Sequence, residues 1–141
     1  MGDRQLENLV RIGQLKSEPP AEAEIQGLVQ SGLRRLDDAG RRELSLESRF
    51  DLAYNAAHAL ALAALRLRGY RSESRYLVFQ CLQHTLNLPV EQWRVLDQAH
   101  RKRNLAEYEG YMDVDEQLVA ATLRVAREVS ERVNKLMGFD R

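Results

Sequence analysis

The sequence predicts an all-α fold: an antiparallel up-and-down bundle of four to five core helices, preceded by an N-terminal helical hairpin. Three observations lead to this prediction. Apolar residues recur at helical spacing along most of the chain, and no stretch shows the alternation typical of a strand. Only 8 glycines and 3 prolines occur in 141 residues. The breaks between periodic segments are short, which favours antiparallel packing of successive helices.

One domain is expected over residues 1–141, because this length supports a substantial core but is short for two ordinary domains. Within it, accessory helices are expected over 1–42 and a core bundle over 45–138. The first accessory helix covers 4–16 and is ended by Pro19-Pro20, since proline cannot continue a helix. The second begins at this proline pair and runs to Leu36.

Four further helices are predicted for the core. The first is capped by Ser45 and reaches Leu67, with apolar residues on more than one face, so it should be central or lie at a dimer interface. The next covers 73–87, and a third opens at Pro89. The last follows the capping-box pattern Asp113-x-x-Glu116 and ends near residue 136.

The total charge indicates no polyanionic partner, because 21 basic and 21 acidic residues cancel. A nucleic acid would therefore have to use a local patch. The sequence offers two arginine-rich stretches for this purpose, residues 101–103 with Arg94 before them, and the residues around the Gly69 turn, Arg66, Arg68, Arg71 and Arg75.

A reducing cytoplasm is the predicted location. The chain has one cysteine, Cys81, and opens with Met-Gly-Asp-Arg-Gln instead of a basic segment followed by an apolar run. Its longest apolar-rich stretch, 56–67, is shorter than the roughly 20 residues that span a bilayer. No membrane partner is expected.

The segment from His100 to Tyr111 places a polar cluster on a helix whose periodicity turns it inward. Arg103 projects into the middle of the apolar arc, so its guanidinium is either buried and paired, with Glu107 or Asp97, or lines a pocket. Its helical neighbours along the same stripe are His100, Asn104, Glu107, Tyr108 and Tyr111.

These residue types suit phosphodiester chemistry. A guanidinium binds phosphate bidentately, an asparagine amide orients a hydroxyl, and a histidine or tyrosine one turn on can exchange a proton. Together they could favour cleavage by an RNA 2′-hydroxyl, with no cofactor. No metal site is expected, because the three histidines and Cys81 lack metal-ligand spacing.

The segment Arg103-Asn104-Leu105-Ala106-Glu107-Tyr108 resembles the signature of HEPN domains, in which Arg is commonly followed by Asn and then by His four to six residues later. The stretch Tyr54-Asn55-Ala56-Ala57-His58 and the break at Gly69-Tyr70 are similar to the core helix of that family. The resemblance covers about residues 45–138. It implies a four- to five-helix bundle and usually a dimer whose two motifs face a shared cleft. Many members are metal-independent ribonucleases of toxin–antitoxin, antiphage or RNA-processing systems, while others bind nucleotides or are inactive scaffolds.

The resemblance implies catalytic roles for Arg103, Asn104 and Tyr108. Tyr108 takes the place of the histidine, and a phenol with a pKa near 10 is a poor base at neutral pH, so weak or lost activity is expected. His100 and His58 are possible contributors as proton carriers. Further candidates for substrate binding are Arg101, Lys102, Glu107 and Tyr111.

Two hypotheses about function remain open. The first is a cytoplasmic homodimer that binds RNA or a nucleotide, with a cognate nucleotidyltransferase antitoxin as possible partner. The second is a non-enzymatic dimerisation or protein-interaction module in which the Arg-Asn-Tyr cluster is structural. In the second hypothesis Arg103 satisfies a carboxylate, and Tyr108 and Tyr111 are packing residues.

Overall fold

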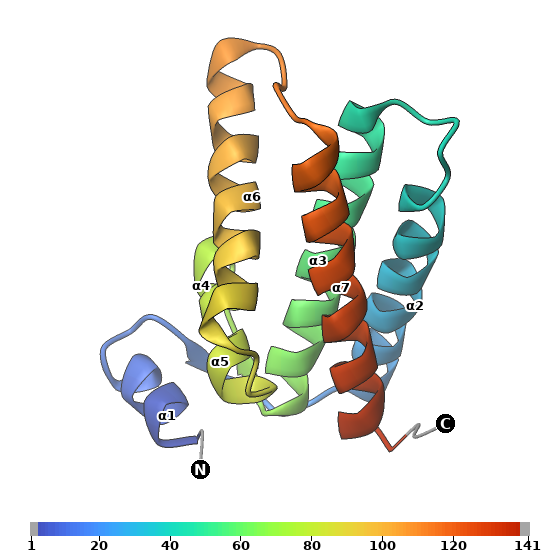
Figure 1. Cartoon of the computed structure of the whole chain (residues 1–141). Helices are drawn as coiled ribbons and strands as arrows, with labels where there is room; N and C mark the ends of the chain where they lie inside the picture. The colour runs from blue at the N-terminus through green and yellow to red at the C-terminus, as the bar shows by residue number, and fades with distance from the viewer. Residues whose placement is uncertain (1–2, 139–141) are drawn as a thin grey trace.

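A computed structural model describes residues 3–138, so the first two and last three residues of the expected 1–141 domain lie outside the described residues. Its body consists of four long helices, namely α2 (Glu22–Ala39), α3 (Leu46–Leu67), α6 (Val90–Glu109) and α7 (Glu116–Leu136). In Figure 1, α2 and α6 run upward while α3 and α7 run downward. The smaller elements are α1 (Asp3–Arg11), β1 (Lys16–Ser17), β2 (Tyr70–Arg71), α4 (Arg75–Gln80) and α5 (Leu82–Thr85). The prediction of a mostly helical chain is confirmed.

Helix α3 forms the centre of the bundle. It contacts α2 and α7 along its length and also meets α4, α5, α6 and β2. Twelve of its residues are buried, seven of them alanines, so neighbouring helices approach closely on more than one side. A helix that is apolar around most of its circumference is stable only when it is covered in this way. The predicted central position of this helix is confirmed.

The ends of α3 and α7 are fixed by side-chain caps. The Ser48 amide donates to Ser45 Oγ at 3.1 Å, and the Leu118 amide donates to Asp115 Oδ1 at 2.8 Å. The prediction that Ser45 caps α3 is therefore confirmed. The start of α7 differs from the prediction, because Asp115, and not Asp113, has the extended backbone of the cap and accepts the bond from the first turn.

Two predicted helices are shorter than expected. The first ends at Arg11, because Gly13 turns the chain at a φ of +80° and residues 16–17 then pair antiparallel with residues 70–71. The helix predicted over 73–87 is divided at Cys81 into α4 and α5. The His84 amide donates to the Cys81 carbonyl three residues back, and this tighter turn keeps the side chains on both sides of the break buried.

The predicted N-terminal hairpin is wrong. Helix α1 packs against α5, whereas α2 packs along α3 and α7 and belongs to the body of the bundle (Figure 1). Tertiary bonds place α1 there, because Tyr70 Oη donates to Glu7 Oε2 at 2.5 Å and the Leu6 side chain is fully buried. Helical periodicity does not encode such contacts between distant segments.

Arg66 joins the end of α3 to the start of α2. Its side chain is fully buried, although the guanidinium carries a positive charge. It donates to the carbonyls of Glu18, Pro19 and Tyr70 at 2.9, 2.8 and 3.3 Å, and to Glu24 Oε1 at 3.0 Å. The buried donors therefore have partners, as buried charge requires.

Arg71 supports this network from its more exposed side. It donates to Glu18 Oε2 at 3.1 Å and to Glu24 Oε2 at 2.6 Å. The hydrogen bond from Arg71 lowers the pKa of the Glu24 carboxyl, against an opposing effect of desolvation, and Arg66 adds to the lowering. We call Arg66, Arg71, Glu18 and Glu24 the Arg66 network.

Within residues 3–138, none of the helices combines the length and the apolar character that a bilayer crossing requires.

Replacement of Arg66 by methionine should destabilise the fold by about 3 kcal/mol, because it leaves three backbone carbonyls and one carboxylate without their buried donor. Urea unfolding followed by circular dichroism measures this loss. Arg71→Met is the matched control, since the Arg71 side chain also contacts Glu18 and Glu24 but is 29% exposed. Equal stability of Arg66→Met and wild type would show that the network does not hold the fold.

A glycine pair on α2 provides a second test. A Cβ at Gly32 would lie 2.6 Å from Leu60 Cγ on α3, whereas a Cβ at Gly27 would meet nothing within 4 Å. We expect Gly32→Ala to destabilise by about 1 to 3 kcal/mol through overpacking. Gly27→Ala should stabilise by about 0.5 to 1 kcal/mol through helix propensity. Thermal unfolding compares the two variants, and a stabilised Gly32→Ala would contradict the close packing of α2 on α3.

Candidate functional site

Three helices bring polar side chains together on one side of α3. Helix α3 contributes Asp51, Tyr54 and Asn55, which lie three to four residues apart and so share a face. Helix α4 contributes Arg75 from its first turn, which Ser74 caps by accepting a bond from the Leu77 amide at 3.2 Å. Helix α6 adds its own three- and four-residue repeat of polar residues. We call the whole set the Tyr54 cluster: Asp51, Tyr54, Asn55, Arg75, His100, Arg103 and Asn104.

Tyr54 is the centre of this cluster. Its side chain is buried, and its Oη lies 3.0 Å from His100 Nδ1. The guanidinium carbons of Arg75 and Arg103 lie 5.5 and 5.6 Å from the centroid of its ring. Both distances are within cation–π range, so the aromatic ring holds two positive groups near each other.

A hydrogen-bonded chain runs from Asn104 to Tyr54. The Asn104 amide nitrogen donates to His100 Nε2 at 3.2 Å. In the tautomer that carries its proton on Nδ1, His100 accepts at Nε2 and donates from Nδ1 to Tyr54 Oη. The hydroxyl hydrogen of Tyr54 is then directed to another acceptor, which a ligand oxygen can provide.

Aromatic neighbours hold the His100 ring. It stacks on Tyr54 with an interplanar angle of 16° and a centroid distance of 6.3 Å. Phe79 contacts it edge-on at 6.3 Å, and Tyr76 lies 6.5 Å away. Contacts on several sides leave the imidazole little rotational freedom, so its hydrogen-bonding geometry is preset.

The two arginines of the cluster have different partners. Arg103 Nη1 lies 3.1 Å from Asp51 Oδ1, and both side chains keep solvent exposure, at 28% and 44%. An ion pair of this kind contributes little and can be exchanged for another anion. Arg75 Nη1 donates to Asn55 Oδ1 at 3.1 Å, a neutral acceptor. Among residues 3–138 no carboxylate oxygen lies within 4.0 Å of a guanidinium nitrogen of Arg75.

Burial changes the acid–base properties of the site. It raises the pKa of Tyr54, with partial compensation by Arg75 and Arg103. It lowers the pKa of His58 to about 4, and nearby Arg75 and His100 act in the same direction. It also lowers the pKa of His100. At neutral pH the phenol is therefore protonated and both imidazoles are neutral.

The structure brings part of the predicted site together. Arg103, Asn104 and His100 belong to the Tyr54 cluster, and His58 lies one turn further along α3, with its ring 5.9 Å from Phe79. The partner of Arg103 is Asp51. The expectation of Glu107 or Asp97 is wrong because α3 faces Arg103 directly, and Asp97 pairs with Arg101 at 3.0 Å.

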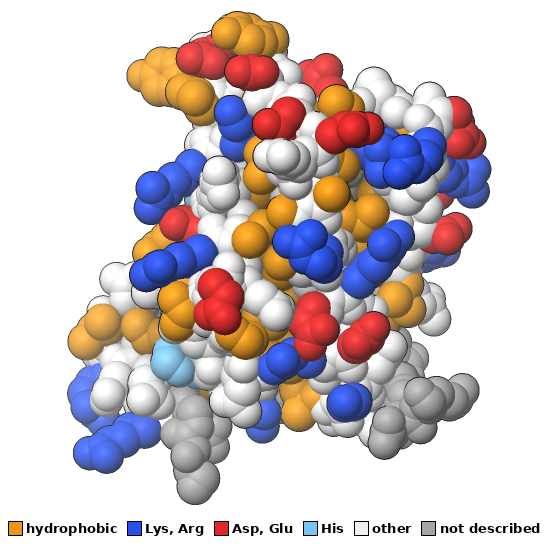
Figure 2. All heavy atoms as spheres, in the orientation of Figure 1, with side chains coloured by type: hydrophobic (Ala, Val, Ile, Leu, Met, Phe, Trp, Pro, Cys, Tyr) orange, Lys and Arg blue, Asp and Glu red, His pale blue; other side chains and the backbone are white. Residues whose placement is uncertain are grey.

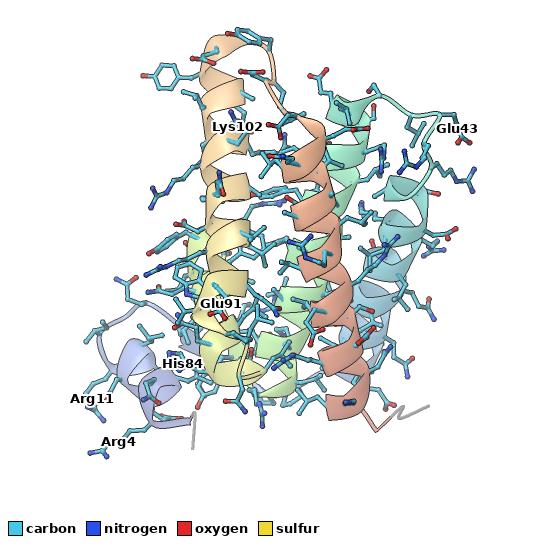
Figure 3. The ribbon with its side chains drawn as sticks, viewed as in Figure 1. Arg4, Arg11, Glu43, His84, Glu91 and Lys102 are labelled. Atoms are coloured by element: carbon cyan, nitrogen blue, oxygen red, sulfur yellow. The ribbon has the colours of Figure 1, made fainter. Side chains whose placement is uncertain are left out.

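Other predicted residues lie apart from the cluster. Tyr108 is 93% exposed and Tyr111 is 63% exposed, so the inward stripe does not continue to them. The reason is that α6 extends beyond the helices that would cover its last turn (Figure 1). The Arg101 side chain is 78% exposed, and Lys102 lies beside Asp113 and Asp115 toward α7 (Figure 3). Glu107 is exposed, but its charge acts on Tyr54.

The arginines around the Gly69 turn do not form one patch. Arg66 and Arg71 belong to the Arg66 network, and Arg68 donates to the Thr85 carbonyl at 2.9 Å. Only Arg75 joins the candidate site. Sequence reasoning did not connect Arg75 or Asp51 with Arg103. The available signals were the helical spacing of residues 51, 54, 55 and 58 and the Ser74 cap, and neither indicates which helix faces α6.

Within the described chain, no three His, Cys, Asp or Glu side chains gather as a metal site would require. No protein-family model matches the sequence, and no curated protein or solved structure is significantly similar to it.

The low pKa of His58 predicts a pH-dependent stability. The unfolded state binds a proton near pH 6.5, whereas the folded state does so near pH 4, so this contribution is complete above pH 6.5 and is lost as the pH falls toward 4. Wild type should lose about 2 kcal/mol between pH 7 and about pH 4.5 through His58 alone. His58→Gln should remove this part of the dependence, as measured by urea unfolding at each pH.

His84→Gln is the control, because burial also lowers the pKa of His84, which lies on α5 instead of α3. If His58→Gln retained the full wild-type slope while His84→Gln lost it, the assignment to His58 would be wrong.

Proposed function

We propose that this chain is a HEPN-like helical protein that binds the phosphate groups of RNA or of a nucleotide at the Tyr54 cluster. One observation carries the proposal: two guanidiniums lie beside the same buried tyrosine ring, and one of them, that of Arg75, bonds to neutral groups and has no carboxylate oxygen within 4.0 Å among the described side chains. Guanidinium groups held in this way present N–H forks that match phosphate oxygens.

The neighbouring groups favour an oriented phosphate. Arg103 can exchange its ion pair with Asp51, which lacks hydrogen-bond geometry, for a bond to a phosphate oxygen, while the Tyr54 hydroxyl supplies a neutral donor. Tyr76 is 42% exposed and packs edge-on against Trp93 at 6.2 Å. A half-exposed aromatic ring beside a phosphate site can stack on a nucleobase, which favours a nucleotide-containing ligand over free phosphate.

Any cleavage of RNA at this site would be weak. Attack by a 2′-hydroxyl needs a base, and His100 is neutral, but its two ring nitrogens are already bonded to Tyr54 and Asn104. His58 is neutral as well and stands against Phe79. Tyr108, with 93% exposure, has no contact that would activate it. We therefore propose binding as the main function and assign no chemical step to Tyr108.

A specific observation also favours the second candidate, an interaction module. Three apolar or aromatic side chains, Leu105, Tyr108 and Tyr111, are 49%, 93% and 63% exposed near the end of α6. Figure 2 shows apolar side chains gathered at this end of the molecule. Exposed aromatic clusters are typical of protein interfaces. A homodimer, a cytoplasmic location and a nucleotidyltransferase antitoxin partner remain proposals that rest on the HEPN resemblance.

The proposed function predicts that Arg75→Gln and Arg103→Gln each weaken RNA binding about tenfold, because each removes one charged hydrogen-bond donor to phosphate. Fluorescence anisotropy with a labelled single-stranded RNA of about 12 nucleotides measures the dissociation constant. Arg101→Gln is the matched control. Arg101 lies two residues from Arg103 and carries the same charge, but its side chain is 78% exposed and pairs with Asp97 at 3.0 Å.

Sedimentation and thermal unfolding of the same variants separate the two candidates. Under the proposed function Arg103→Gln remains folded in the wild-type oligomeric state, because both side chains of its ion pair are partly exposed, at 28% and 44%. Under the interaction hypothesis Arg103→Gln dissociates or unfolds instead. RNA affinity unchanged in both cluster variants, with the fold intact, would remove the Tyr54 cluster from consideration.

A further inference from the structure

A second basic surface lies on the side of the molecule formed by α2, α3 and α7. A groove of about 480 Å³ runs between α7 and the turn that joins α2 to α3. Figure 2 shows basic side chains over α7 and beside this turn. Four arginines line the groove, Arg42 from the turn, Arg49 from α3, and Arg124 and Arg127 from α7. None of them belongs to the Tyr54 cluster.

These guanidiniums lack acidic partners within the described residues. No carboxylate oxygen between residues 4 and 138 lies within 4.0 Å of the guanidinium nitrogens of any of the four. Arg49 Nε donates to the Ala39 carbonyl at 2.9 Å, which leaves its terminal nitrogens available. Of the two acidic residues in the lining, Glu128 accepts a hydrogen bond from Arg132 Nε at 2.7 Å. Four arginines against two glutamates leave the groove lining positive, although the total charge of the chain is zero.

The backbone of the turn makes room for one of these arginines. A Cβ placed on Gly40 would lie 3.3 Å from Arg127 Nη2 and 3.5 Å from the Asp37 carbonyl oxygen. The guanidinium of Arg127 is thus seated against the C-terminal end of α2, where a larger residue would crowd it. Arg124 and Arg127 are three residues apart on α7, so they are neighbours on one helix face.

We propose that this groove binds a chain of phosphate groups, independently of the Tyr54 cluster. Phosphates supply only acceptors, and the arginine side chains of the groove supply only donors. An acidic peptide fits less well, because its backbone N–H groups need acceptors. The groove side chains offer acceptors only at Glu128 and Glu131. The phosphate chain is either the backbone of a single-stranded RNA or the polyphosphate of a free nucleotide, which the experiment separates.

The double variant Arg124→Gln, Arg127→Gln tests the groove. It is made in a background that already carries Arg75→Gln and Arg103→Gln, so that binding by the Tyr54 cluster does not mask the result. Probes are a labelled single-stranded RNA of about 12 nucleotides, ATP and inorganic tripolyphosphate. The control is Arg4→Gln, Arg11→Gln, which removes the same charge from exposed positions of α1, distant from the groove (Figure 3).

We expect the groove variant to lose about tenfold in RNA affinity, and the control to change by less than about twofold. The slope of log affinity against log salt concentration should fall by about 1.4, since each phosphate contact to a single strand contributes about 0.7. Loss of RNA binding with little change for ATP and tripolyphosphate identifies the strand as ligand. Loss for all three probes identifies the polyphosphate group.

Three results would overturn the proposal. The first is equal binding of every probe by the groove variant and the control. The second is competition by a poly-glutamate peptide as strong as that by tripolyphosphate, because it would show a preference for carboxylates. The third is a changed sedimentation coefficient in the groove variant without any probe, which would assign the groove to a second copy of the chain. None of these results bears on the Tyr54 cluster, which the single variants test separately.

Discussion

The buried guanidinium of Arg66 is the constraint on which the arrangement of the bundle depends. It lies at the end of α3 and bonds to three carbonyls and one carboxylate contributed by the segment before α2, by β2 and by α2 itself. A buried arginine is tolerated only when its donors are satisfied, so these segments can occupy one position relative to α3. The Arg66 network thereby fixes the start of α2, and the alanine-rich face of α3 then packs along it.

The same helix separates two surfaces. One side of α3 presents Tyr54 and its polar neighbours toward α4 and α6, while the other contributes Arg49 to the groove beside α7. Close packing of small side chains keeps α3 rigid between them. Both surfaces gather arginines whose guanidiniums are only partly paired, although the chain carries no net charge. Both proposed sites therefore depend on the local distribution of charge and not on its total.

Much of the fold could be predicted from the sequence, and the candidate site only in part. Ser45, Pro89 and the apolar repeats of α3 and α7 act locally, through caps, first turns and helix faces, so they indicate where these helices begin. The strand pair between residues 16–17 and 70–71 could not be predicted, because its hydrogen bonds join segments far apart in the chain. The solvent exposure at the end of α6 could not be predicted either. Helical periodicity shows which residues share a face, but that face is buried only where another helix covers it.

The sequence by itself determined the four long helices, and it placed His100, Arg103 and Asn104 on one face of α6 because a period of 3.6 residues aligns them. Only the tertiary structure decided that Asp51, Tyr54 and Arg75 meet this face, while Tyr108 stays in solvent. The physical reason is that spacing within a helix fixes neighbours along that helix, whereas the contacts between helices follow from how their buried faces fit together.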